Sequence, residues 1–176
     1  MLDFFYKYKI YFIAIIVILL LLVLFYIYIL VLDKKLTKQE EKIKKEFKER
    51  LDFIPILYFL TEWKIKMHKK IFSSILEYRK LWIFSYNEML FSHIVWNEIK
   101  IHKELIFIFK VINKLESLKS KDDYIYVEKF FNKNSKKIAE DIYIYKVYAK
   151  ILNKLIKIKN FTLLWLLIPV KYRETF

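Results

Sequence analysis

The chain has 176 residues, of which 57% are hydrophobic and 30% are charged; it carries a formal net charge of +14 and contains no glycine and no cysteine. This length fits one domain with an appended segment. The missing glycine excludes a Gly-rich phosphate loop, a dinucleotide fingerprint and a Gly-x-Ser-x-Gly nucleophile elbow, because each needs backbone conformations that a Cβ atom disfavours. The missing cysteine excludes disulfides, thiolate metal sites and thiol nucleophiles.

The first predicted element is a membrane-spanning helix over residues 10–32, which are 23 uncharged positions between Lys9 and Asp33. As a helix they would be roughly 34 Å long, enough to cross a hydrocarbon core of ~30 Å. A cleaved signal peptide is the alternative, but its apolar region is about 7–15 residues long and ends at small residues. Here Leu32 is followed directly by Asp33. We therefore expect a retained single-pass anchor.

The basic residues on either side of the span predict its orientation. Two lysines, Lys7 and Lys9, precede it, whereas eight basic residues follow it within residues 34–50. Because Lys and Arg are enriched on the cytoplasmic side of membrane spans, the larger group indicates the inside. We expect a plasma (inner) membrane protein with residues 1–9 outside and residues 33–176 as a cytoplasmic helical bundle.

Helical periodicity continues after the span. Between residues 43 and 58, apolar residues recur every three or four positions, so their side chains would lie on one face of a helix. The membrane helix is therefore predicted to continue into the bundle, with a bend at Pro55, which lacks an N–H and clashes with the preceding turn. The series consists of Ile43, Phe47, Leu51, Ile54 and Tyr58.

A second long helix is predicted from Ser73 to Ser117. In its stretch from Leu81 to Trp96, eleven of sixteen residues are apolar, more than one helix stripe holds. Two interpretations remain open. The stretch is either a central bundle helix buried on several sides, or an exposed surface for self-association, a protein partner or the membrane.

The segment from Ser117 to Asp123 predicts a break, with Ser120 as the N-cap of a third helix and the acids after it suited to the positive end of the helix dipole. This helix is expected to end before Asn160. The apolar residues 161–170 should then dock onto the bundle and stop at Pro169. The predicted core face of the third helix consists of Ile138, Ile142, Tyr145, Ala149, Leu152 and Ile156.

No pattern in the chain predicts catalysis. The histidines His68, His93 and His102 are too far apart to form a zinc-binding pair on one helix turn. The acid pairs 40–41 and 122–123 lie among polar residues that keep carboxyl pKa values low, so they indicate a solvated face and a helix start. We therefore expect no enzyme, no catalytic or metal-binding residue, no cofactor and no small-molecule substrate.

The positive charge has several explanations. Beyond the first 32 residues the chain keeps 31 basic against 18 acidic residues, which favours contact with an anionic membrane surface. Nucleic-acid binding is disfavoured because the lysines are spread over all predicted helices and not gathered on one face. The abundance of Lys, Ile, Phe, Tyr and Asn is also typical of AT-biased coding, so part of the charge carries no functional information.

Residues 49–57 have the sequence ERLDFIPIL, directly after the predicted membrane span and a charged helix. This segment resembles the Arg-x-Asp-Leu-Ile-Pro-x-Leu motif of LemA family proteins, and weaker matches follow in the same order up to the closing residues 171–176. Departures include Lys146 and Leu152 at expected Asn and Tyr positions. The residues that carry the resemblance are Arg50, Asp52, Ile54, Pro55, His68, Glu77, Arg79, Tyr145 and Asn153.

The resemblance implies a bacterial single-pass membrane protein with an antiparallel bundle of long helices and no established enzyme activity. Together with the span and the apolar stretch, it leads us to expect a scaffold or interaction protein that acts through its cytoplasmic bundle. The alternatives are a membrane-bound enzyme of unrecognised type, or a basic tether to the membrane surface or to nucleic acid.

Overall fold

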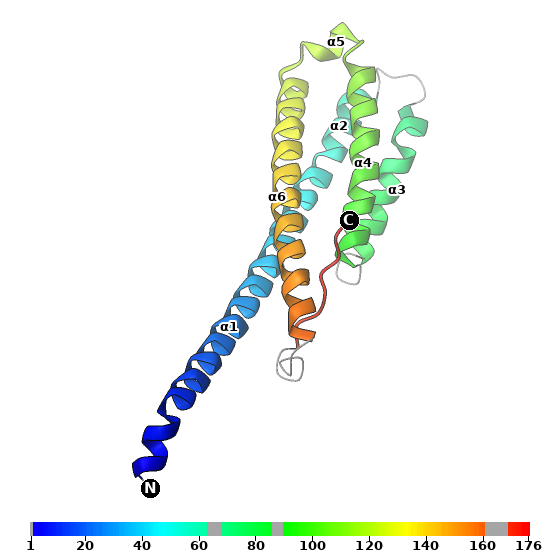
Figure 1. Ribbon diagram of the computed structural model, residues 1–176. Helices are drawn as coiled ribbons and strands as arrows, with labels where there is room; N and C mark the ends of the chain where they lie inside the picture. Colours follow the sequence, from blue (N-terminus) through cyan, green and yellow to red (C-terminus); the bar gives the residue numbers. More distant parts are fainter. Residues whose placement is uncertain (1, 63–67, 86–89, 161–168) are drawn as a thin grey trace. The chain divides into compact units, whose positions relative to one another are not determined.

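The computed structural model describes residues 2–62, 68–85, 90–160 and 169–176, and in these ranges it contains α-helices and no strands (Figure 1). The all-α prediction is therefore confirmed. The chain divides into two compact units, the first formed by Met1–Lys38 with Val147–Arg173 and the second by Gln39–Lys146 with Glu174–Phe176. The helices are α1 (Leu2–Asp52), α2 (Ile54–Thr61), α3 (His68–Ser85), α4 (Phe91–Ile112), α5 (Glu116–Lys119) and α6 (Asp122–Asn160).

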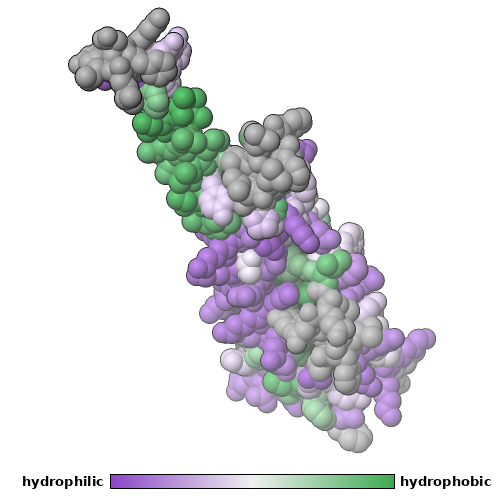
Figure 2. Space-filling view, turned by 90° about the horizontal axis from the view of Figure 1, so that it is seen from below, coloured by the Kyte–Doolittle hydropathy of each residue, from purple (hydrophilic) through white to green (hydrophobic). Residues whose placement is uncertain are grey.

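The N-terminal part of α1 exposes its apolar side chains. Nearly all large hydrophobic residues between Ile10 and Val31 are exposed, and Figure 2 shows them as a continuous apolar surface. Among the described residues, one helix near the N-terminus is long and apolar enough to cross a membrane. The helix also runs without interruption from Leu2 to Asp52, as the prediction of a continuous first helix requires.

In the first unit, α1 and α6 share an apolar seam that includes Ile29, Leu36 and Leu152, all fully buried. The last residues of the chain are tied to both helices. The Asn153 side chain accepts a hydrogen bond from the backbone N–H of Arg173 (2.9 Å) and donates one to its carbonyl (2.7 Å). The Arg173 guanidinium pairs with Asp33 at 2.6 Å.

In the second unit, α3 and α4 run antiparallel to each other, as do α4 and α6 (Figure 1). The predicted apolar faces form its core. Ile43, Phe47, Leu51 and Ile54 are buried on α1 and α2. On α4, Ile101, Leu105, Ile108 and Ile112 are buried at the same helical spacing. Of the predicted α6 face within this unit, Ile138 and Tyr145 are buried and Ile142 is half-buried.

The predicted bend at Pro55 is confirmed, since α1 ends at Asp52 and α2 begins at Ile54. Proline at position 55 has no N–H to donate to the carbonyl of Leu51, four residues earlier. In the structure that carbonyl accepts a hydrogen bond of 3.3 Å from Nε of Arg79, which lies on α3. A side chain from another helix thus replaces the backbone donor that proline removes.

The prediction of one helix from Ser73 to Ser117 is wrong. α3 ends at Ser85, α4 begins at Phe91 and ends at Ile112, and Leu90 has the extended dihedrals φ −58° and ψ 143°. Residues 86–89 lie outside the described ranges. Serine and asparagine, which occur at positions 85 and 87 of the sequence, are residue types with a lower helix propensity than alanine or leucine. Because the apolar periodicity of the sequence continues across this break, it predicted one helix where the structure has two.

The predicted N-cap at Ser120 is also wrong. Ser120 is the C-cap residue of the short helix α5, and its hydroxyl donates to the Glu116 carbonyl at 3.3 Å. α6 instead begins at Asp122, with Asp122 and Asp123 in its first turn as expected. It ends at Asn160, one residue later than predicted. Of the predicted C-terminal docking segment, residues 161–168 lie outside the described ranges, and Val170 is buried.

Candidate functional site

In the second unit, charged and polar side chains from α1, α4 and α6 meet inside the core. Arg50 is 4% exposed and Glu98 is 2% exposed, and Nη1 of Arg50 lies 3.7 Å from Oε2 of Glu98. The remaining donors of Arg50 are directed to α6, with Nε donating to Oδ1 of Asn134 (3.1 Å) and Nη2 to Oγ of Ser135 (3.3 Å). Arg50 therefore links three helices.

The helical register explains why these polar groups are buried. Glu98 follows Ile94 by four positions and precedes Ile101 by three, so it occupies an apolar-face position of α4. Asn134 and Asp141 flank Ile138 in the same way on α6. Sequence reasoning missed these three residues. The signal in the sequence that could have identified them is a polar residue at a position where the helical spacing predicts a core apolar residue.

Two further acids lie beside this cluster. Lys137 Nζ lies 2.7 Å from Oε1 of Glu46, and burial raises the pKa of Glu46 while the hydrogen bond from Lys137 opposes that rise. Oδ1 of Asp141 accepts hydrogen bonds from Lys42 (2.7 Å) and Gln39 (2.9 Å). Burial would raise the pKa of Asp141, but these hydrogen bonds outweigh it and lower the pKa.

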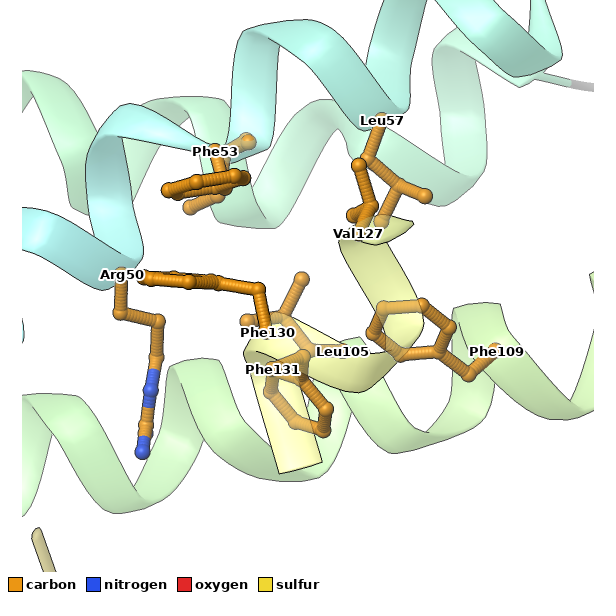
Figure 3. Close-up of a pocket in the computed structure, with 9 residues that line it drawn as sticks. Arg50, Phe53, Leu57, Leu105, Phe109, Val127, Phe130 and Phe131 are labelled. Carbon is orange, nitrogen blue, oxygen red and sulfur yellow. The ribbon is translucent and has the colours of Figure 1, made fainter. Parts of the chain in front are cut away.

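Aromatic rings pack against one side of the cluster (Figure 3). The Phe53 and Phe130 rings stack with centroids 3.7 Å apart, and the Arg50 side chain runs alongside them toward α4. The Arg50 guanidinium lies 5.6 Å from the centre of the Phe131 ring. The space left among these rings has a volume of about 10 Å³, which is room for about one water molecule. This part of the core is filled.

A larger cavity of about 210 Å³ opens on the other side of Arg50, among α1, α4 and α6. Glu98 and His102 line it, and neither Oε1 nor Oε2 of Glu98, nor Nδ1 of His102, has a hydrogen-bond partner within the described part of the chain. The complete lining consists of Phe47, Arg50, Val95, Glu98, Ile99, His102, Lys103, Ser135, Ile138, Ala139 and Ile142.

Burial controls the ionisation of these groups. It raises the pKa of Glu98 to about 8, against the opposing attraction of Arg50. Burial, together with the positive charge of Arg50, lowers the pKa of His102. Near neutral pH the cavity wall therefore holds a carboxyl group close to its titration point and an uncharged imidazole, which is a combination able to give and accept protons.

Five of the nine residues that carry the LemA resemblance lie in three separate locations. Arg50 belongs to the polar cluster. Ile54, Pro55 and Arg79 surround the break between α1 and α2, where Ile54 is buried. Asn153 binds the C-terminal residues in the first unit.

The other residues of that set are dispersed. Asp52 and Glu77 are exposed. His68 is the first residue of α3, and its side chain lies outside the described set. Tyr145 is buried and its hydroxyl donates to Oε1 of Glu40 at 3.0 Å. Glu40, which the sequence assigned to a solvated face, thus contacts a core tyrosine.

The stretch from Leu81 to Trp96 contains both buried and exposed residues. Within its described side chains, Phe91, Ile94 and Val95 are buried, whereas Leu90 is 58% and Trp96 57% exposed. Three further exposed apolar residues lie three, ten and eleven positions after Trp96 on the same side of α4. This exposed stripe, called the α4 stripe below, consists of Trp96, Ile99, Ile106 and Phe107.

In the described ranges, no three His, Asp or Glu side chains come together in an arrangement able to hold a metal ion. No protein-family model, no curated protein and no solved structure matches the chain.

Proposed function

We propose that this chain is a LemA-like, membrane-anchored interaction protein that binds a protein partner, or a second copy of itself, through the α4 stripe. The observation that carries the proposal is the exposed row of large apolar side chains from Trp96 to Phe107 on a helix whose opposite face is already buried in the core. Large exposed apolar side chains that gather on one side of a helix are typical of a binding surface.

The proposal includes a location. The apolar part of α1 would cross the plasma (inner) membrane, and the helices after it would lie in the cytoplasm, in agreement with the basic residues that follow residue 32. The same basic residues would hold the helices near an anionic membrane surface, where each contributes about 1 kcal/mol of attraction. Partner binding would therefore take place close to the membrane.

Photo-crosslinking in intact cells tests the partner surface. A benzophenone amino acid at Trp96 is expected to yield one defined adduct, whereas the same amino acid at Tyr143, a more exposed aromatic position on α6, is expected to yield none. Trp96→Lys should remove an adduct formed from Phe107, because a charge in the stripe opposes apolar docking. Equal adducts from Trp96 and Tyr143, or none from either, would refute the assignment of this surface.

A specific observation also favours the alternative of a membrane-bound enzyme. Such an enzyme needs a concave pocket with convergent polar groups, and the cavity of about 210 Å³ brings Arg50, Glu98 and His102 to one place. We propose these three residues as the ones to substitute if an activity is sought.

A further inference from the structure

The polar atoms of the cavity wall that lack a hydrogen-bond partner can all accept hydrogen bonds from a ligand. Both carboxyl oxygens of Glu98 and Nδ1 of His102 are buried without a hydrogen-bond partner in the described part of the chain, although buried polar atoms are nearly always paired. When Glu98 is ionised and the imidazole keeps its proton on the other nitrogen, these three atoms are acceptors. A ligand that satisfies them must bring several N–H donors close together.

Part of the nearest cationic group is already engaged within the protein. Arg50 directs Nε to Asn134 and Nη2 to Ser135. Its Nη1 faces Oε2 of Glu98 at 3.7 Å, so an anion placed at Nη1 would lie next to the Glu98 carboxyl group and would be repelled once that group is ionised. The available acceptors therefore favour a cationic donor over an anion.

The size and lining of the cavity limit the rest of the ligand. Its volume of about 210 Å³ exceeds the roughly 150 Å³ that accepts a benzene molecule in a protein core. Apart from the polar groups, its walls are aliphatic and aromatic. The apolar lining residues are Phe47, Val95, Ile99, Ile138, Ala139 and Ile142.

We propose that this cavity binds a small primary amine with an apolar body of about six to eight carbon atoms, whose ammonium group is held by Glu98 and His102. This inference goes beyond the partner-binding function proposed above and does not depend on it. Three ammonium N–H groups match the three acceptors that lack a hydrogen bond in the described part of the chain, and the alkyl or aromatic body fills the apolar part of the cavity.

Binding of a cation should ionise Glu98 and release its proton, since burial holds the pKa of this carboxyl well above its usual range. The charged group that acts on Glu98 is Arg50 from α1, and Lys103 of α4 also lines the cavity, while Glu46 acts on Arg50 from within α1. His102 stays neutral because its pKa is lowered. The affinity should thus rise about tenfold per pH unit below pH 8 and level off above it.

Calorimetry on the full-length protein in detergent tests the site with hexylamine, 1-hexanol and hexanoate as probes. We expect saturable binding of hexylamine, at least tenfold tighter than that of either other probe. Glu98→Gln should weaken hexylamine binding at least tenfold, whereas Glu104→Gln, which removes a carboxylate of the same helix outside the cavity lining, should change it less than twofold.

A second variant separates ligand binding from folding. Ala139 is an exposed residue of the cavity lining, so Ala139→Leu should block the cavity without altering a charge, and it should weaken hexylamine binding at an unchanged melting temperature. Three results would overturn the proposal. Hexanoate binding best would make Arg50 the ligand-binding group, equal binding of hexanol would make the site purely apolar, and no binding of any probe would leave water as the occupant.

Discussion

Arg50 contacts both neighbouring helices and an aromatic ring while remaining 4% exposed. A buried guanidinium is stable only when its donors are used and its charge is countered. Asn134 and Ser135 supply the acceptors, and the nearby acids Glu98 and Glu46 favour the charged form of the guanidinium. Removing one partner of such a group costs more free energy than the pair contributes, because the other is left buried and unpaired.

The titration of Glu98 predicts how stability depends on pH. Its pKa rises from 4.5 to about 8 on folding, so between these values the folded state holds a proton that the unfolded state has lost. The free energy of unfolding therefore falls as pH rises, by at most about 1.4 kcal/mol per pH unit. His102 has a lowered pKa and acts in the opposite direction only below pH 6.5.

Urea unfolding between pH 6.5 and 8 measures this effect. The wild-type protein and Glu104→Gln should lose stability over this range, while Glu98→Gln should show a clearly smaller slope, because glutamine does not titrate. An equal slope in Glu98→Gln would mean that Glu98 is already ionised in the folded protein.

The break between α1 and α2 depends on a contact from α3 as well as on Pro55. Pro55 leaves the Leu51 carbonyl without its backbone donor, and Arg79 from α3 donates to that carbonyl instead. Pro55 and Arg79 are 24 positions apart in the sequence. The two residues are connected through the Leu51 carbonyl, to which Pro55 cannot donate and Arg79 does. This hydrogen bond joins α3 to the end of α1.

A double-mutant cycle tests this relation. Arg79→Leu should destabilise the protein by about 1–3 kcal/mol, because a partly buried carbonyl loses a charged donor. In a Pro55→Ala background the same change should cost clearly less, since the alanine N–H can bond to the Leu51 carbonyl. Denaturant unfolding of the four proteins gives the coupling energy. An additive result would show that Arg79 stabilises the protein through other contacts.

At the scale of the whole molecule, charge and hydrophobicity are separated along the chain. The long apolar segment of α1 precedes a sequence in which basic residues exceed acidic ones by 13. We expect this asymmetry to place the C-terminal side of the span in the cytoplasm.

Cysteine labelling tests the orientation, and the absence of native cysteine makes any introduced thiol unique. In spheroplasts, Ser74→Cys should resist an impermeant thiol reagent until the membrane is permeabilised. Lys9→Cys, on the other side of the apolar segment, should react without permeabilisation. The reverse labelling pattern would invert the orientation and place the helices outside.

The sequence by itself determined the helical class, the apolar segment of α1, the bend at Pro55 and the buried faces of α1, α4 and α6. These features depend on local periodicity and on the length of an apolar run, which can be read along one chain. Local reasoning failed at residues 85–91, where periodicity continued across a helix break, and at Ser120, whose hydroxyl bonds within α5.

Only the tertiary structure decided which polar groups are buried and what they contact. Glu98 alone is an acid in an apolar series, and its role depends on Arg50 and Asn134, which lie 48 and 36 positions away. The cavity likewise exists because side chains of three helices leave space where they meet. Such properties arise from the packing of one helix face against another, and no single segment of the sequence contains that information.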